Sequence, residues 1–191
     1  MYPITAILGR RGDGKTCFAT FLAKLDSDRG RKIYANYHLF GIPYEYITLE
    51  KVAELPTWLH NATIILDEIQ EGADSREIFK KGNKSLTKLA TQLRKRQLTL
   101  YYTTQVFTMA DKRIREQTDY IVECEKVQKT NPTHFHIRVY DRELPFNTDM
   151  VNEFIFHGEP IFKYYDTNEV IHYTGEPTSN DEASDEEIEI D

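Results

Sequence analysis

Three glycines, a lysine and a threonine are closely spaced near the start of the chain, in Gly9-Arg10-Arg11-Gly12-Asp13-Gly14-Lys15-Thr16. This is the pattern GxxxxGK[ST], in which glycine backbone lets successive N–H groups point at a phosphate. Its lysine reaches the β- and γ-phosphates of a nucleoside triphosphate, and its threonine hydroxyl ligates Mg²⁺. We therefore predict ATP and Mg²⁺ as ligands. The expected nucleotide-binding residues are Gly9, Arg10, Arg11, Gly12, Asp13, Gly14, Lys15, Thr16 and Cys17.

The segments on both sides of this loop have the character that the pattern requires. Ile4–Leu8 is a short, largely apolar run that is typical of a buried strand. After the loop, apolar residues recur at spacings of three and four from Phe18 to Leu25, which predicts an amphipathic helix. A strand, a loop and a helix in this order favour a true phosphate-binding loop over a chance match in a glycine-rich turn.

Two acids, Asp67 and Glu68, follow a second apolar run at 62–66. The carboxyl ends of strands in an α/β sheet form its ligand-binding edge, so we expect this pair beside the loop. Asp67 would hold Mg²⁺ together with Thr16, and Glu68 would orient and deprotonate the water that attacks the γ-phosphate. The alternative is that both acids only end a strand.

A third run, Leu98–Gln105, ends in an amide that is expected at the same edge of the sheet. Gln105 would contact the γ-phosphate and the attacking water, and so report which nucleotide is bound; a strand-capping amide is the alternative. Arg94 and Arg96 precede this strand, at the opposite edge, where they cannot easily reach the nucleotide of their own chain. Either could serve a neighbouring subunit as an arginine finger, or contact nucleic acid or solvent.

The segment from Lys80 to Arg96 contains seven Lys or Arg residues and no acid. Apolar residues between 86 and 93 fall on one face of a helix, and Lys84, Lys88 and Lys95 fall on the opposite face. The apolar face would pack on a sheet, and the lysine face would attract a polyanion, for which nucleic acid is the natural candidate. A lysine face in contact with solvent alone is the alternative.

Further strands and helices are expected before residue 125. The strands are Lys32–Tyr37, Tyr44–Thr48 and Tyr120–Cys124, and the helices are Leu49–Leu55 and Met109–Gln117. Asn36 is expected to hydrogen-bond its own backbone where its strand ends. Strands that alternate with helices predict an α/β fold with a mainly parallel sheet.

The pattern changes after Cys124. His134–Arg142 alternates polar and apolar residues, and Ile161–Tyr165 and Glu169–Tyr173 flank the turn residues 166–168, so we predict antiparallel strands and a hairpin. His134 and His136 share one face, but no third ligand is spaced to complete a metal site. We therefore predict a P-loop ATPase core at 1–125, a β-rich extension of the same domain at 126–175, and a disordered acidic tail at 176–191.

Composition limits the remaining possibilities. The 191 residues have a formal net charge of −7, yet eight acids and no Lys or Arg lie from Glu176 onward, so the rest of the chain is close to neutral. No apolar run approaches the roughly 18 residues that cross a bilayer, and the first residues do not resemble a signal peptide. With Cys17 and Cys124 as the only cysteines, a reduced intracellular compartment is expected.

Four stretches together resemble the FtsK/HerA superfamily of P-loop ATPases: Gly9–Thr16, Ile64–Glu68, Arg94–Arg96 and Thr103–Gln105. The resemblance covers about residues 3–124. It is closest to the packaging ATPases of icosahedral viruses with internal membranes and to the zonula-occludens-toxin-like proteins of filamentous phages. It implies a RecA-like sheet with strand order 5-1-4-3-2, and a ring, usually a hexamer, that moves duplex DNA. Its catalytic groups would be Lys15, Glu68, Gln105 and either Arg94 or Arg96, and its metal ligands Thr16 and Asp67.

These features predict a Mg²⁺-dependent, ATP-hydrolysing DNA translocase of the viral genome-packaging kind. The expected partners are double-stranded DNA and further copies of the chain in a homo-oligomeric ring, with a capsid or membrane protein as a further candidate. The expected location is the cytoplasm of a host cell, with association with the virion as an alternative. Three other functions compete with this prediction: a zonula-toxin-like assembly or secretion ATPase, a small P-loop phosphotransferase, and a slowly hydrolysing nucleotide-gated binding module.

Overall fold

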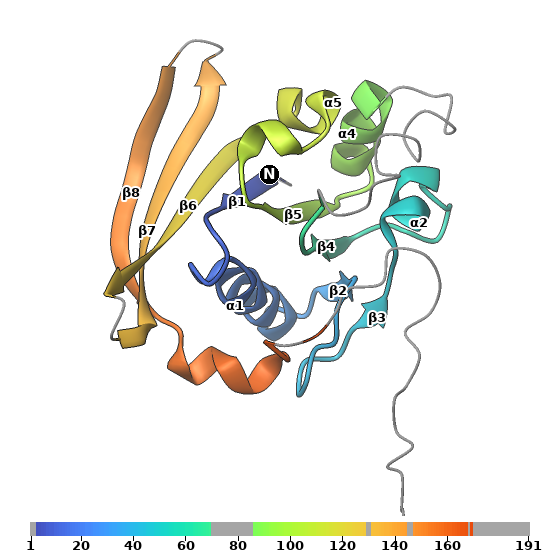
Figure 1. Ribbon diagram of the computed structural model, residues 1–191. Coiled ribbons are helices and arrows are strands. Elements are labelled where there is room, and N and C mark those ends of the chain that lie inside the picture. Colours follow the sequence, from blue (N-terminus) through green and yellow to red (C-terminus); the bar gives the residue numbers. More distant parts are fainter. Residues whose placement is uncertain (1–2, 70–85, 129–130, 145–146, 168, 170–191) are drawn as a thin grey trace, which may run out of the picture.

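The computed structural model describes residues 3–69, 86–128, 131–144, 147–167 and 169 of the chain. The described strands form one sheet in the order β3-β2-β4-β5-β1-β6-β7-β8 (Figure 1). Neighbouring strands are parallel from β3 to β6, whereas β6, β7 and β8 are antiparallel to one another. The predicted α/β fold, with a mainly parallel sheet and a C-terminal antiparallel extension, is confirmed.

The elements have the following bounds. The strands are β1 (Ile4–Leu8), β2 (Lys32–Ala35), β3 (Glu45–Tyr46), β4 (Ala62–Leu66), β5 (Thr99–Thr104), β6 (Tyr120–Gln128), β7 (Asn131–Leu144) and β8 (Asn147–His157). The α-helices are α1 (Lys15–Asp28), α2 (Leu49–Glu54), α4 (Leu86–Lys95) and α5 (Lys112–Glu116), and the 3₁₀ helices are η1 (Phe107–Met109) and η2 (Glu159–Tyr164).

The five main strands of the parallel part of the sheet follow the order expected from the resemblance. These strands lie side by side in the order β6-β1-β5-β4-β2. If the two-residue β3 is left out and the strands are renumbered along the chain, this order is 5-1-4-3-2. The whole sheet differs in detail, because β3 extends it beyond β2 and the hairpin of β7 and β8 extends it beyond β6. The extension thus continues the central sheet.

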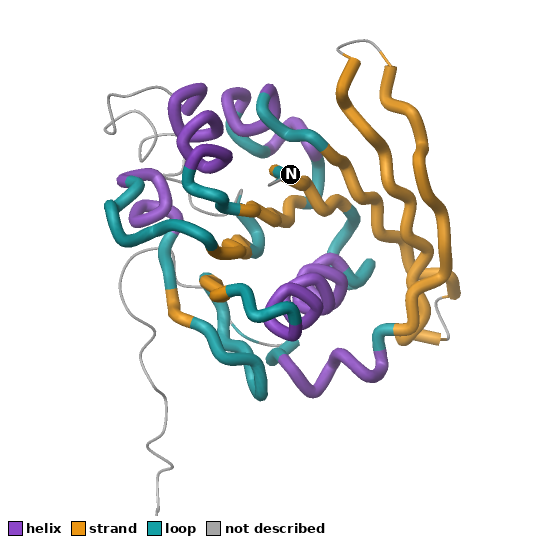
Figure 2. Tube along the Cα trace, turned by 180° about the vertical axis from the view of Figure 1, so that it is seen from behind, coloured by secondary structure: helices purple, strands orange, loops and turns teal. Residues whose placement is uncertain are grey.

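Apolar cores lie on both faces of the sheet, and helices cover both faces (Figure 2). Successive residues of β4 show why its sequence is a continuous apolar run: Ile64 and Leu66 join the core that includes Leu93 of α4, and Ile65 joins the core that includes Phe18 of α1. A parallel strand that is covered on both sides has no solvent-facing positions, so polar residues do not alternate along it. The parallel strand ends are thereby held in fixed register.

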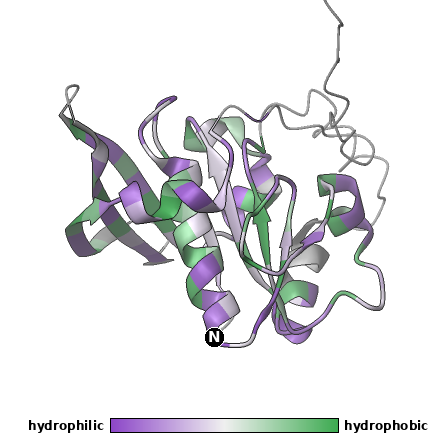
Figure 3. Cartoon of the chain, turned by 90° about the horizontal axis from the view of Figure 1, so that it is seen from below, coloured by the Kyte–Doolittle hydropathy of each residue, from purple (hydrophilic) through white to green (hydrophobic). Residues whose placement is uncertain are grey.

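The hairpin of β7 and β8, which we call the arm (residues 131–144 and 147–157), packs one face against α1. Phe156 of the arm lies with its ring centroid 5.4 Å from that of Phe18 and 5.1 Å from that of Phe21, both on α1. Phe135 and Ile137 of β7 belong to the same core. Hydrophobic and hydrophilic residues alternate along the arm, as Figure 3 shows, because its other face is turned to solvent.

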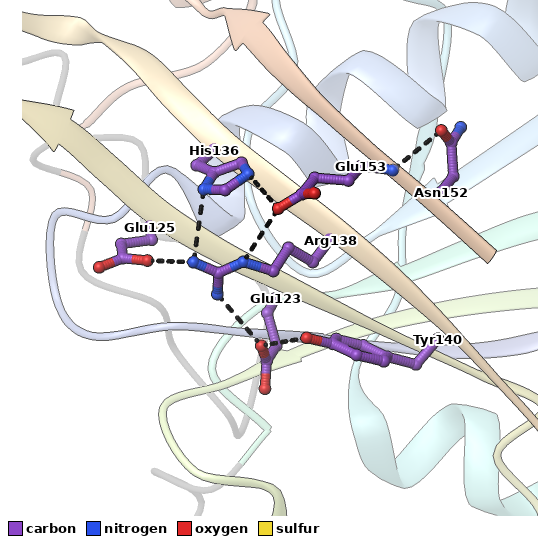
Figure 4. A network of polar contacts seen from close by, with 7 residues as sticks. All are labelled: Glu123, Glu125, His136, Arg138, Tyr140, Asn152 and Glu153. Atoms are coloured by element: carbon purple, nitrogen blue, oxygen red, sulfur yellow. Dashed lines mark hydrogen bonds and ion pairs between the residues drawn. The ribbon is translucent and has the colours of Figure 1, made fainter. Parts of the chain in front are cut away.

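The solvent-facing side of the arm carries a network of ion pairs centred on Arg138 (Figure 4). The Arg138 guanidinium lies 2.6 Å from the Glu125 carboxylate, 3.4 Å from that of Glu123 and 3.6 Å from that of Glu153. His136 also contacts Glu153, at 2.7 Å. Exposed pairs of this kind contribute little energy individually, but they favour one cross-strand register. Among the described residues, no group of three or more His, Cys, Asp or Glu residues is placed to hold a metal ion.

The predicted hairpin around residues 166–168 is wrong where the structure describes it. Residues 159–164 form the 3₁₀ helix η2, with Pro160 in its first turn and Gly158 before it. Proline favours a helical start because its φ is already fixed there, and Ile161 is buried on the same core as α1. The structure places the hairpin earlier, at β7 and β8, and β8 was not predicted. Residues 170–173 and the acidic tail lie outside the described residues.

One predicted helix is divided, and another is described in part. The stretch 109–117 contains the end of η1 and the short helix α5. In the basic segment, α4 covers residues 86–95 and its buried Leu93 packs in the core, as the apolar spacing predicts. Lys84 and the Lys88 side chain lie outside the described part of the chain, so their predicted exposure is untested, whereas Lys95 is exposed.

Candidate functional site

The glycine-rich loop joins β1 to α1, as its pattern predicts. Gly12 and Gly14 have φ values of 83° and 86°, in the left-handed region that favours glycine. No side chain caps the start of α1, and no acid lies in its first turn. The first N–H groups of the helix are therefore available to an anion, and the helix dipole favours negative charge there.

Lys15 is buried at the base of the loop, with 5% of its surface exposed. Its Nζ donates a hydrogen bond to the Arg10 carbonyl at 3.0 Å, and the Arg10 N–H donates to the Asp13 carboxylate at 2.8 Å. The ammonium group is thus held inside the curve of the loop, within a side-chain rotation of any phosphate bound there. Asp13 closes the loop on itself.

Asp67 lies directly beside the start of α1. Its carboxylate accepts a hydrogen bond from the Thr16 hydroxyl at 2.9 Å and another from the Thr103 hydroxyl at 2.5 Å. Burial raises the pKa of the Asp67 carboxyl above its ordinary value, and the two hydroxyl donors and the charge of Lys15 partly oppose this rise. Two adjacent oxygen ligands on rigid elements, one of them a buried carboxylate, fit the preference of Mg²⁺ for oxygen donors.

Glu68 occupies the left-handed region with φ 48°, and its N–H donates to the Thr103 hydroxyl at 2.7 Å. This backbone conformation is unusual for a residue other than glycine and is typical of functional sites. Gln105 directly follows β5, whose end pairs with that of β1. However, Gln105 is not among the described residues that line the cavity over the loop.

Arg94 and Arg96 lie at the amino end of β5, opposite the loop. Arg94 pairs with Asp119 at 2.5 Å, and Arg96 donates to the carbonyls of Leu55 and Pro56 at 2.9 and 2.6 Å. Both guanidinium groups thus have partners within the chain. The arginine-finger role of either residue stays a prediction.

Two strand-end residues that position Asp67 were not predicted to do so. The Asn36 side chain accepts from the Asp67 N–H at 2.7 Å and donates to the Asp67 carbonyl at 3.0 Å. The expectation that Asn36 binds its own backbone is therefore wrong: it connects the end of β2 to the end of β4. Thr103 of β5 holds the same acid from the other side. The signal in the sequence that could have identified both residues is a polar side chain at the end of a buried strand.

The loop and the acids open into one cavity of about 360 Å³. Gly12 and Lys15 of the loop and Glu68 after β4 form one part of its lining. A second part of the lining comes from the extension, including Phe135 of β7 and Phe162 of η2. Neither ring was predicted to belong to the site.

Cys17 follows the phosphate loop and is fully buried. Its Sγ contacts the Gly158 carbonyl at 3.6 Å, and its thiol is hydrogen-bonded to Tyr165. Burial raises the pKa of the Cys17 thiol to about 12, so it is protonated at neutral pH and is unreactive. Its side chain therefore packs against the extension, as a small hydrophobe would.

Alanine at Gly14 is expected to destabilise the protein more than alanine at Gly12. Both substitutions place a Cβ at a left-handed φ, which costs about 1–2 kcal/mol. At Gly14 the new Cβ would also lie 2.6 Å from the Phe135 ring, whereas at Gly12 it would meet no atom within 4 Å. Overpacking of this kind adds about 1–3 kcal/mol. Urea unfolding of the two variants measures the difference.

Gly12→Ala is the matched control, because it reproduces the backbone strain without the clash. Equal losses of unfolding free energy in the two variants would show that Phe135 can move away, and that β7 is not packed firmly on the loop. Unfolding midpoints at equal m-values make the comparison valid.

The fold is that of the RecA-like P-loop ATPases, in which a phosphate-binding loop and an acidic strand end meet at one edge of a parallel sheet. No family model matches the chain, and no curated protein matches it. Among solved structures, it is similar to the N-terminal domain of zonular occludens toxin from Neisseria meningitidis, with 15% identity, coverage of 87% of this chain and 100% of the other, and a TM-score of 0.58.

Two further solved structures have the same fold, with similarly low sequence identity. B204, the DNA-packaging ATPase of Sulfolobus turreted icosahedral virus, matches with 13% identity, 78% and 96% coverage, and a TM-score of 0.51. A KaiC-like protein from Pyrococcus horikoshii matches with 17% identity, 81% and 85% coverage, and a TM-score of 0.50. The expected resemblance to viral packaging and zonula-toxin-like ATPases is confirmed at the level of the fold. No helix in the described residues is long and apolar enough to span a bilayer.

Proposed function

We propose that the chain is an ATP-hydrolysing DNA translocase of the viral genome-packaging kind. The observation that carries the proposal is the contact between Thr16 and Asp67 at 2.9 Å, with Lys15 and Glu68 lining the same cavity. Groups for binding phosphate, for holding a divalent cation and for activating water are therefore within reach of one triphosphate. An adjacent Asp-Glu pair favours water as the acceptor over a substrate hydroxyl.

Each group has a role that follows from its position. Lys15 and the uncapped N–H groups of α1 bind the β- and γ-phosphates and stabilise the charge that develops on them. Thr16 and Asp67 are the residues that would hold Mg²⁺, which when bound neutralises phosphate charge. Glu68, held by Thr103 through its N–H, orients the attacking water and accepts its proton.

The remaining roles concern coupling between subunits and DNA. Gln105 lies at the strand edge next to the site and would transmit the state of the nucleotide to its own segment. Arg94 or Arg96 would serve the nucleotide of a neighbouring subunit in a ring, after exchange of its present partners within the chain. The basic segment 80–96 would contact the DNA backbone. DNA packaging is the stated role of B204, which supports this substrate for a chain of the same fold.

An ATPase that acts in assembly or secretion, on protein or single-stranded DNA, is the second candidate. The arm favours it, because Met150, Val151 and Ile155 of β8 are 52%, 55% and 48% exposed. Exposed apolar side chains on an edge strand suit a protein partner.

An ATPase assay with Mg²⁺ and either duplex DNA, single-stranded DNA or no DNA tests both candidates. The translocase is expected to hydrolyse ATP faster with duplex DNA than with single strands, and Lys15→Ala is expected to abolish turnover. Lys24→Ala is the control, since the Lys24 side chain is partly exposed, pairs with Asp28 and does not line the cavity. No hydrolysis by the wild type would overturn the ATPase proposal. A rate of hydrolysis that is the same with and without duplex DNA would overturn the translocase proposal.

A further inference from the structure

The segment that follows the arm contributes part of the lining of the nucleotide cavity. We call residues 159–167, which comprise η2 and the three residues after it, the strap. Phe162, Tyr165, Asp166 and Thr167 of the strap all line the cavity. In Figure 1, η2 lies along α1 on the side away from α4 and α5. A C-terminal segment thus forms a wall of a site whose floor is the N-terminal loop.

The direction in which a nucleoside triphosphate would lie in the site places the strap at the nucleoside end of the ligand. Lys15 reaches the β- and γ-phosphates, and the acids at the end of β4 mark the γ-phosphate side. The N–H groups at the start of α1 cradle the α- and β-phosphates, so a nucleoside continues beyond Cys17. Cys17 lies against this segment: its Sγ contacts the carbonyl of Gly158, the residue before the strap, at 3.6 Å, and its thiol is hydrogen-bonded to Tyr165 of the strap.

The side chains of this wall have the chemistry that a nucleoside requires. The rings of Phe162 and Tyr165 lie 6.5 Å apart at 67°, so one ring supports the other from its edge. Phe162 is partly exposed and Tyr165 is 8% exposed, which leaves Phe162 as the ring with an accessible face. Asp166 and Thr167, both exposed, bring a carboxylate and a hydroxyl to the same wall.

The strap is held in place by the segment after β2, so it is ordered before a ligand arrives. The Phe40 N–H donates to the Tyr164 carbonyl at 2.9 Å, and Leu39 forms a β-bridge with Tyr165. Just beyond the strap, the Glu169 carboxylate accepts from the His38 N–H at 2.9 Å. Because this wall is already ordered, little conformational entropy is lost in it when a flat ligand binds.

We propose that the strap is the nucleoside-binding wall of the site, in which Phe162 stacks on the purine base of ATP and Asp166 and Thr167 hydrogen-bond the ribose. This inference rests on the proposed ATPase function and adds to it: the extension outside the P-loop core determines which nucleotide binds. The phosphate end is recognised by α1 and its loop, and the nucleoside end by a segment about 150 residues later in the chain.

A comparison of two ligands tests this division. The affinities of ATP and inorganic triphosphate, each as its Mg²⁺ complex, are measured by calorimetry for the wild type and for Phe162→Ala. Loss of one stacked ring is expected to weaken ATP binding about tenfold and to leave triphosphate binding unchanged. Phe162→Leu, which keeps the apolar bulk without the flat face, is expected to lose most of the same affinity and serves if the alanine variant folds poorly.

Tyr164→Ala is the matched control, because Tyr164 lies in the same 3₁₀ helix and does not line the cavity. It is expected to bind both ligands as the wild type does. Unchanged ATP affinity in Phe162→Ala, or equal weakening of ATP and triphosphate, would overturn the strap proposal and leave the ATPase proposal intact. A wild type that binds neither ligand would overturn both.

Discussion

Glu68→Gln is expected to abolish ATP turnover and to leave ATP binding intact. Glutamine keeps the size of the side chain and can still orient a water, but its amide cannot accept a proton from that water. Removal of a general base lowers rates by about 10²–10⁴-fold. Single-turnover hydrolysis and equilibrium ATP binding, measured on the same preparation, separate the two effects.

The substitution at residue 68 leaves the local backbone structure unchanged. The left-handed φ of 48° and the hydrogen bond from its N–H to Thr103 belong to the main chain, so both remain in the variant. Glu54→Gln is the control, because Glu54 is an exposed acid on α2 paired with Lys51. Turnover in Glu68→Gln equal to that of the control would remove Glu68 from the mechanism.

The local part of the site could be predicted from the sequence because its geometry depends on neighbours along the chain. The spacing from Gly9 to Thr16 defines the loop, and the loop needs a strand before it and a helix after it. The apolar run that ends at Asp67 is likewise a local signal of a strand covered on both faces. The structure places these segments side by side, with Thr16 and Asp67 in contact.

The parts of the site that depend on neighbours across the sheet could not be predicted in the same way. Asn36 and Thr103 hold Asp67 from β2 and β5, and their partners follow only from the strand order. For Asn36, a hydrogen bond to its own backbone is the local option, and the observed bond joins residues 31 positions apart. Pairings of this range are fixed by tertiary packing, which overrides local preference.

The strap shows how a local signal can mislead. Residues 166–168 are favourable in turns, and the apolar residues before them suggested a strand. Yet Pro160 favours a helical turn directly after Gly158, and Ile161 gains burial against α1 in that conformation. Packing on α1, which lies over 130 residues earlier, decides the outcome.

Asp67→Asn is expected to have opposite effects on function and on stability. Loss of the carboxylate removes the only acidic oxygen in contact with Thr16 among the described residues, so Mg²⁺-dependent turnover should fall about 10³-fold. The ligand-free protein should become more stable by about 1 kcal/mol, because burying a neutral amide costs less than burying a carboxylate. Asparagine fits the site, because its amide can donate to one threonine hydroxyl and accept from the other.

The physical reason for the gain is that burial disfavours the charged form of the Asp67 carboxyl in the folded protein. Burial raises the folded-state pKa of Asp67 above its ordinary value of 3.8. Below that ordinary value both states are protonated, and the contribution of Asp67 to stability is fully present. As the pH rises through the raised folded-state pKa, the folded protein must give up a proton that it binds more tightly than the unfolded chain does, and that contribution is lost.

Thermal unfolding without Mg²⁺ or nucleotide, from pH 4 to pH 8, therefore tests the position of Asp67. At neutral pH the melting temperature of Asp67→Asn should exceed that of the wild type by about 2–4 °C, and the difference should shrink toward acid pH. Asp28→Asn is the control, since Asp28 is an exposed acid in the last turn of α1, at the opposite end of the helix from Thr16. A lower melting temperature for Asp67→Asn at neutral pH would mean that the hydrogen bonds from Thr16 and Thr103 outweigh burial. The negative charge of Asp67, which we expect Mg²⁺ to neutralise, would then stabilise the folded protein in the absence of ligand.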